Sequence, residues 1–86
     1  METNWYVYIV RCKDATLYTG VTTDPEKRVL AHNGAMAGAK YTKARRPVKL
    51  VYTESGFNRS EAHKRESTIK KLSKTAKENL IKGVDK

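Results

Sequence analysis

Two tyrosines and an arginine–histidine pair are spaced so that the fold could bring them together. Tyr8 and Tyr18 lie in two neighbouring segments rich in aromatic and β-branched residues, and Arg28 and His32 lie four residues apart in the next segment. Residues four apart share one face of a helix. Arginine binds phosphate oxygens, and histidine can take up or release a proton near neutral pH. In isolation, each tyrosine is explained by packing, and the Arg28–His32 pair by a solvated basic face.

A carboxylate interrupts the apolar stripe of a later segment. Glu66 stands four residues after Ala62 and three before Ile69, in a stripe that continues to Leu72. A buried carboxylate costs free energy unless it is paired or holds a metal ion. Glu66 is therefore a metal ligand, a partner in a salt bridge, or a residue that reaches solvent at the edge of the stripe. The sequence alone leaves these alternatives open.

Positive charge is concentrated in two segments of the chain. There are 18 Lys+Arg against nine Asp+Glu, a net charge of +9, and residues 27–49 hold seven basic residues and no acidic one. Residues 64–86 hold eight basic and three acidic residues, and this segment includes Lys70 and Lys71. Such a field attracts polyanions through phosphate contacts. A solvated surface is the simpler explanation of a lysine-rich helix, but one segment interleaves arginine and an aromatic with lysine and favours nucleic acid: Lys40, Tyr41, Lys43, Arg45 and Arg46.

The elements that must position these residues are three strands and three helices. Residues 5–12 and 17–22 are predicted strands joined by a turn short enough for an antiparallel hairpin, so Tyr8 and Tyr18 could share one face. Residues 48–53 are the third predicted strand. Each predicted helix has a capping signal: Asp24 and Pro25 for a helix ending near residue 31 or 32, Asn58 and Glu61 for residues 59–72, and Ser73 for a short helix before Gly83. The order strand, strand, helix, strand, helix, helix predicts an α+β fold.

Length and composition predict one small domain over residues 1–86. A chain of this size buries only about 60–65% of its extended surface on folding. No apolar run approaches the roughly 20 residues that cross a bilayer, and the N-terminus carries no secretory signal. The single cysteine, Cys12, excludes an internal disulfide and is expected to be a small packing residue. We expect a soluble, intracellular, cytoplasmic protein that binds no membrane.

In this order, the residues resemble the GIY-YIG nuclease superfamily, particularly its small stand-alone members. The first motif corresponds to Tyr6-Val7-Tyr8 and the second to Tyr18-Thr19-Gly20, followed by Arg28, His32 and Glu66. The match covers nearly the whole chain. It implies a three-stranded antiparallel sheet flanked by helices, and metal-dependent hydrolysis of a phosphodiester.

The resemblance also implies a role for each matching residue. Glu66 would hold a divalent metal, Tyr8 would act as general base or orient water, Tyr18 would position water or phosphate, Arg28 would stabilise the phosphate, and Gly20 would permit close packing. His32 stands where family members carry His or Tyr, and Asn79 is the nearby candidate for the family's late asparagine. Because no second carboxylate is placed to hold another ion, we expect a single Mg²⁺ or Mn²⁺ site.

Two residues depart from the motifs, and the general base stays open. Tyr6 replaces the glycine of the first motif and Thr19 the isoleucine of the second, but neither is a catalytic side chain. An unperturbed tyrosine has a pKa of about 10 and is protonated at neutral pH, which makes His32 the chemically easier base. Tyr8 and His32 therefore both stay candidates.

We predict a divalent-metal-dependent nuclease that hydrolyses phosphodiester bonds of nucleic acid. DNA is the favoured substrate, although the sequence does not decide between DNA and RNA, and a monomer is expected. The alternative is a basic nucleic-acid-binding module without turnover, which needs only the two positive segments. A basic protein-interaction or ribosome-associated domain is a third possibility.

Overall fold

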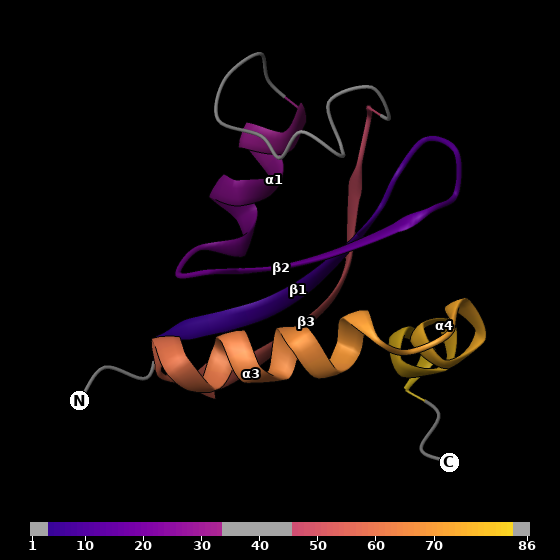
Figure 1. Cartoon of the computed structure of the whole chain (residues 1–86). Coiled ribbons are helices and arrows are strands. Elements are labelled where there is room, and N and C mark those ends of the chain that lie inside the picture. The colour runs from indigo at the N-terminus through magenta and orange to yellow at the C-terminus, as the bar shows by residue number, and fades with distance from the viewer. Residues whose placement is uncertain (1–3, 34–45, 84–86) are drawn as a thin grey trace.

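Three antiparallel strands form one sheet in the order β2-β1-β3 (Figure 1). The computed structural model describes residues 4–33 and 46–83. Strand β1 spans Trp5–Arg11, β2 spans Leu17–Thr22 and β3 spans Lys49–Phe57. The α+β fold and the predicted order of elements are confirmed. The third strand is longer than predicted, because it continues beyond residue 53 to pair Phe57 with Trp5 of β1.

Three helices flank the sheet, and each begins at the predicted signal. Helix α1 spans Pro25–Asn33, α3 spans Arg59–Lys70 and α4 spans Lys74–Lys82. A side-chain cap satisfies free backbone N–H groups at the start of each helix. Asp24 Oδ1 accepts from the Lys27 N–H at 3.1 Å, and Ser73 Oγ accepts from the Ala76 N–H at 3.1 Å. Asn58 forms a capping box with Glu61. Within the described residues, no helix has the length and apolar character needed to cross a bilayer.

One side of the sheet packs on α3, which runs beneath it in Figure 1. Val7 and Ile9 of β1 are fully buried there against Ala62 and Ile69 of α3. Ala62 and Ile69 are seven residues apart, so they lie one above the other on the helix face that meets the sheet. This is the apolar stripe that the sequence predicts.

The other side of the sheet packs on α1, above the sheet in Figure 1. Tyr8 and Val10 point to this side because successive strand residues alternate, and they cluster with Cys12 and Val48. Val29 of α1 covers the cluster. Cys12 is 4% exposed, as expected of a small packing residue. The two sides of β1 therefore carry two separate buried clusters.

Polar groups also tie the helices to the sheet. The Arg65 guanidinium of α3 donates two hydrogen bonds to the Glu54 carboxylate of β3, at 2.8 and 2.9 Å, and Tyr52 donates a third at 2.5 Å. Arg11 of β1 forms a bidentate pair with Glu78 of α4 at 2.7 and 2.8 Å. Bidentate pairs of this kind fix orientation as well as distance.

A second set of hydrogen bonds joins the end of α1 to the start of β3. The Asn33 amide donates to the Val48 carbonyl at 3.0 Å and accepts from the Val48 N–H at 2.6 Å. Arg46 Nε donates to the His32 carbonyl at 2.8 Å. Residues 33 and 46–48 are therefore held together although they are far apart in the sequence.

Thr19 places a hydroxyl in the interior and leads to a stability prediction. It is 3% exposed, opposite Ile9, and its Oγ1 has no hydrogen-bond partner within the described residues. An unsatisfied buried hydroxyl costs about 1–3 kcal/mol. We expect Thr19→Val, nearly the same shape, to raise the free energy of unfolding by about 1 kcal/mol in urea titrations. Thr53→Val, at an exposed position of β3, is the control and should change the free energy of unfolding little. A loss of stability in Thr19→Val would mean that the hydroxyl is bonded.

Candidate active site

The Tyr8 ring lies directly against the backbone of Gly20 on the neighbouring strand. The register of β1 and β2 places Tyr8 opposite Gly20. A Cβ atom at residue 20 would stand 2.5 Å from the Tyr8 hydroxyl oxygen and 2.7 Å from Cζ. Real Cβ contacts are never this short, so residue 20 must be glycine for the ring to lie there. The phenol hydroxyl is thereby carried across β2.

The hydroxyl of Tyr8 meets His32 on the last turn of α1. Tyr8 Oη and His32 Nε2 are 2.8 Å apart, and both side chains are buried. The Tyr18 ring completes the group, with its centroid 5.4 Å from that of His32 and 6.5 Å from that of Tyr8. The predicted common face of the two tyrosines is thus present. The interpretation of the Arg28–His32 pair as a solvated basic face is wrong for His32, because α1 turns His32 inward onto the sheet.

Arg28 lies one helical turn before His32 and acts on the same hydroxyl. Burial raises the pKa of Tyr8, although the guanidinium of Arg28 interacts with its hydroxyl and favours the ionised phenolate. Burial lowers the pKa of His32, and the positive charges of Arg28 and Arg46 lower it further. At neutral pH the pair therefore consists of a protonated phenol and a neutral imidazole. In that state one ring nitrogen of His32 can accept a proton.

Glu66 lies on the flank of α3, close enough to Tyr8 to disfavour the ionised form of its hydroxyl. Its side chain is 17% exposed, and Oε2 is 3.2 Å from Lys70 Nζ while Oε1 is 3.5 Å from His63 Nδ1. Its negative charge contributes to the raised pKa of Tyr8. Lys70 Nζ in turn lies 6.0 Å from the centre of the Tyr18 ring, so it is near both the Glu66 carboxylate and Tyr18.

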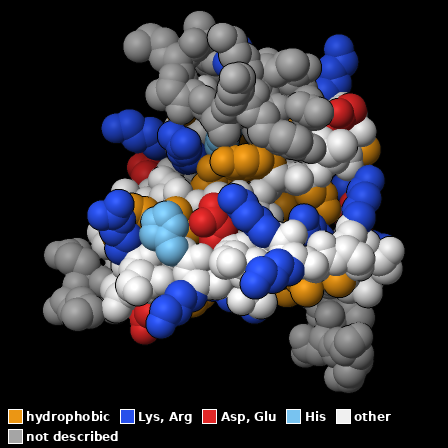
Figure 2. Space-filling view, in the orientation of Figure 1, with side chains coloured by type: hydrophobic (Ala, Val, Ile, Leu, Met, Phe, Trp, Pro, Cys, Tyr) orange, Lys and Arg blue, Asp and Glu red, His pale blue; other side chains and the backbone are white. Residues whose placement is uncertain are grey.

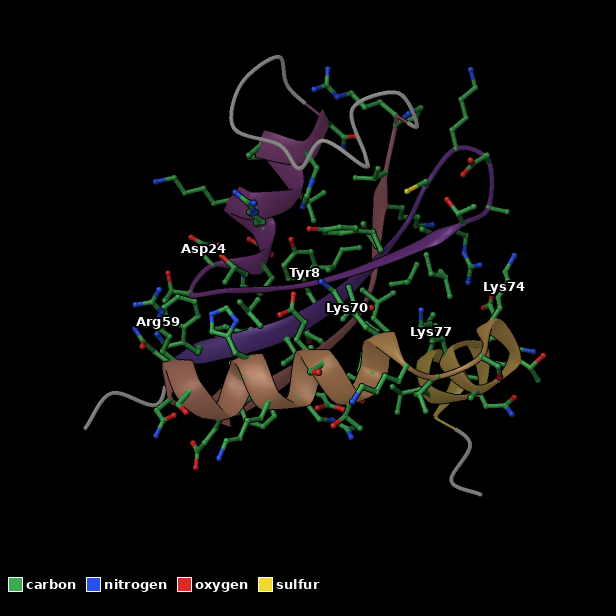
Figure 3. The ribbon with its side chains drawn as sticks, viewed as in Figure 1. Tyr8, Asp24, Arg59, Lys70, Lys74 and Lys77 are labelled. Atoms are coloured by element: carbon green, nitrogen blue, oxygen red, sulfur yellow. The ribbon has the colours of Figure 1, made fainter. Side chains whose placement is uncertain are left out.

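The views of the surface and of the side chains agree with these contacts. Figure 2 shows an acidic side chain in the middle of this face, flanked by a histidine and by lysine or arginine. Figure 3 shows Lys70 rising from α3 toward the strands on which Tyr8 lies. The salt bridge that the sequence left open therefore exists, and it does not remove Glu66 from the neighbourhood of the tyrosines.

The donor atoms at this place fit one hard divalent cation. No group of three or more His, Cys, Asp or Glu within residues 4–33 and 46–83 could hold a metal. Mg²⁺ does not need one, because it keeps several waters and is bound through one or two carboxylates plus substrate phosphate. The Lys70 ammonium already stands beside Glu66 Oε2 as a cation. Glu66 is the carboxylate that could bind Mg²⁺ or Mn²⁺ here.

The remaining predicted residues are not gathered at this site to the same degree. Lys71 is exposed at the end of α3, and Arg46 is half-buried and bonded to the His32 carbonyl. Asn79 lies on α4, and within the described parts of the chain no hydrogen bond joins its side chain to the tyrosines, Arg28, His32 or Glu66. Four predicted nucleic-acid contacts lie outside the described residues: Lys40, Tyr41, Lys43 and Arg45.

His63 and Arg59 are neighbours of the site that the sequence analysis missed. Both lie on the flank of α3 that carries Glu66, and both meet the Trp5 ring, with His63 at 6.2 Å and Arg59 at 6.0 Å from its centre. The available signal was spacing, since residues 59, 63, 66 and 70 follow one another at three or four positions.

Comparison with known proteins identifies the family. A family model described as the GIY-YIG catalytic domain matches residues 4–79. The UPF0213 protein of Desulfotalea psychrophila is 55% identical over 82 residues, which cover 95% of this chain and 74% of that relative. The UPF0213 protein of Staphylococcus saprophyticus is 57% identical over 76 residues, 88% of this chain and 92% of the relative.

A solved structure agrees with both the fold and the family. The solution NMR structure of a UPF0213 protein from Bacillus halodurans has 44% sequence identity and a TM-score of 0.57, covering 91% of this chain and 82% of that one. Because the family model matches most of the chain, the chain belongs to the GIY-YIG catalytic-domain family. Its matched relatives are UPF0213 proteins, small stand-alone members of that family.

The contact between Gly20 and Tyr8 generates a testable prediction. We expect Gly20→Ala to force the buried ring aside, because its Cβ would overlap two ring atoms and the hydroxyl oxygen of Tyr8, and to lower the free energy of unfolding by about 1–3 kcal/mol. The measurement is a double-mutant cycle in urea with Tyr8→Leu, which lacks those distal atoms. The cost of Gly20→Ala should shrink in the Tyr8→Leu background. Equal costs in both backgrounds would contradict the overlap.

The lowered pKa of His32 predicts a pH-dependent stability. The folded protein binds fewer protons at this residue than the unfolded chain, whose histidine has a pKa of about 6.5. Stability should therefore fall as pH drops below about 7, by at most about 1.4 kcal/mol per pH unit. His32→Gln keeps a hydrogen-bonding group but does not titrate, and should flatten the unfolding free energy between pH 7 and 5.5. An unchanged slope in that variant would assign the effect to another group.

Proposed function

We propose that this protein is a divalent-metal-dependent nuclease that hydrolyses phosphodiester bonds, with DNA as the favoured substrate. The observation that carries the proposal is the Tyr8–His32 hydrogen bond of 2.8 Å, held over Gly20 and beside Arg28, with the Glu66 carboxylate near the same tyrosines. Membership of the GIY-YIG catalytic-domain family supports the reaction type. We propose that it acts as a monomer on intracellular nucleic acid, in the cytoplasm.

The Tyr8–His32 pair suits the removal of a proton from water. Tyr8 alone is a poor base, because burial raises its pKa and keeps the hydroxyl protonated. The neutral His32 imidazole can take that hydroxyl proton as the Tyr8 oxygen takes one from water. The water oxygen then bonds to phosphorus, the bond to the leaving sugar oxygen breaks, and that oxygen is protonated from solvent. Both candidate bases thus take part, Tyr8 at the water and His32 as final acceptor.

Arg28 and Glu66 suit the charge that develops on the phosphate. The Arg28 guanidinium, which favours the ionised form of the Tyr8 hydroxyl, would pair with a phosphate oxygen placed beside it. A Mg²⁺ or Mn²⁺ ion held by Glu66 would supply a Lewis acid at the same phosphate. The phenol of Tyr18, packed edge-on against His32, keeps the imidazole in place and can hydrogen-bond water or phosphate.

A nucleic-acid-binding module without turnover is the second candidate function. The observation that favours it is that both carboxylate oxygens of Glu66 already face a positive or proton-bearing group, Lys70 and His63. A purely structural acid would form the same contacts. Such a module would bind through its basic residues, with an affinity that falls steeply with salt.

The two functions are separated by Glu66→Gln. We expect this variant to cleave about 10²–10³-fold more slowly with Mg²⁺ or Mn²⁺, because an amide binds the cation poorly. Its circular dichroism spectrum should match that of the wild type, which shows that the fold is unchanged. The assay compares linear, flapped and branched DNA and RNA. Glu26→Gln, at an exposed position of α1, is the matched control and should cut like wild type.

The outcomes distinguish the proposals clearly. Wild-type cleavage by Glu66→Gln would show that the metal assignment is wrong. Binding without cleavage of any substrate by the wild-type protein, unchanged in Glu66→Gln, would establish the binding module instead.

A further inference from the structure

Lys70 has an unusual position for a surface lysine. It lies four residues after Glu66 in the last turn of α3, with Nζ 3.2 Å from Glu66 Oε2. The same Nζ stands 6.0 Å from the centre of the Tyr18 ring. The side chain therefore reaches from α3 toward the sheet, as Figure 3 shows, and its ammonium lies near both the Glu66 carboxylate and Tyr18.

The carboxylate cannot offer Oε2 to Lys70 and to a divalent cation with equal strength. A metal ion bound at Glu66 would place two positive charges beside a third, the ammonium of Lys70, at a few ångströms. One of the two cations must yield. Lys70 is the mobile partner, because its side chain is 51% exposed and its stem is flexible.

His63 faces the other oxygen of Glu66. Its Nδ1 lies 3.5 Å from Glu66 Oε1, and its ring also contacts the Trp5 ring. Arg59 lies over the same Trp5 ring and adds to this packing. Lys70 has the longer and more flexible stem of the two partners, so Lys70 is the partner that can move away from Glu66.

We propose that Lys70 is the resident counter-cation of Glu66 in the free protein, and that it competes with the divalent cation for the carboxylate. When the metal binds, the ammonium leaves Oε2 and becomes available to a phosphate of the substrate. In the metal-free protein it screens the negative charge of Glu66 from an approaching polyanion. This inference deepens the proposed function and rests on its assignment of Glu66 as metal ligand.

The first test measures Mn²⁺ affinity directly, by paramagnetic resonance of free Mn²⁺, in wild type, Lys70→Gln, Lys70→Arg and Glu66→Gln. We expect Lys70→Gln to bind Mn²⁺ about three- to fivefold tighter, the size of a weak surface ion pair. Lys70→Arg keeps the charge and should bind like wild type. Lys64→Gln removes the same charge from an exposed position elsewhere on α3 and should change the affinity little.

The second test measures binding of duplex DNA in the presence of a chelator, where no cleavage occurs. Lys70→Gln should weaken DNA binding more than Lys64→Gln does, because it removes one positive charge and also exposes the charge of Glu66. A merely structural lysine would not tighten Mn²⁺ binding and weaken DNA binding at once. These opposite signs are the signature of the competition.

Other outcomes are equally informative. Unchanged or weaker Mn²⁺ binding by Lys70→Gln would overturn the competition. Wild-type protein that binds Mn²⁺ no better than Glu66→Gln would contradict the proposed metal site. In that case the competition would stand only on one further result. Lys70→Gln would have to gain Mn²⁺ binding, and the Lys70→Gln/Glu66→Gln double variant would have to lose it. Absence of that gain would overturn both proposals.

Discussion

The arrangement of the candidate site depends on one close approach, that of the Tyr8 ring to the backbone of Gly20. With no side chain at residue 20, the phenol can lie flat across β2 and extend its hydroxyl to α1. The hydrogen bond to His32 then fixes both the ring and the last turn of that helix. Glycine, tyrosine and histidine therefore act as one structural unit, although they come from three different elements. The positions of Arg28 and Tyr18 follow, because each is on an element that this contact orients.

Electrostatics set the second constraint, since a strongly basic chain keeps the Glu66 carboxylate near Tyr8. Glu66 has a basic group at each oxygen, which offsets the cost of burying a charged side chain in part. Glu54 and Glu78 have a different role, because each carboxylate accepts two hydrogen bonds from one arginine and thereby joins a helix to the sheet. An acid with mobile or weakly held partners can exchange them for a ligand, whereas an acid in a bidentate pair cannot do so without loosening the fold.

Local signals in the sequence predicted most of the fold, and their range of action explains what they missed. Caps at Asp24, Asn58 and Ser73 depend on neighbours within three residues, so the helix starts were predictable. The extension of β3 to Phe57 was not, because its residues 54–56 are Glu, Ser and Gly, and they become strand only through pairing with β1. The burial of His32 was missed for the same reason. Its environment comes from a strand 24 positions earlier in the chain. Glu66 was correctly placed at an apolar stripe, but its partners on the same helix flank needed side-chain geometry.

The junction between α1 and β3 has a consequence for the tyrosine–histidine pair. Asn33 and Arg46 hold the last turn of α1 against the start of β3 through hydrogen bonds to Val48 and to the His32 carbonyl. Because the last turn of α1 carries His32, this turn and the start of β3 must shift together. A perturbation at the start of β3 is therefore transmitted to the imidazole that contacts Tyr8, although it alters neither side chain of the pair.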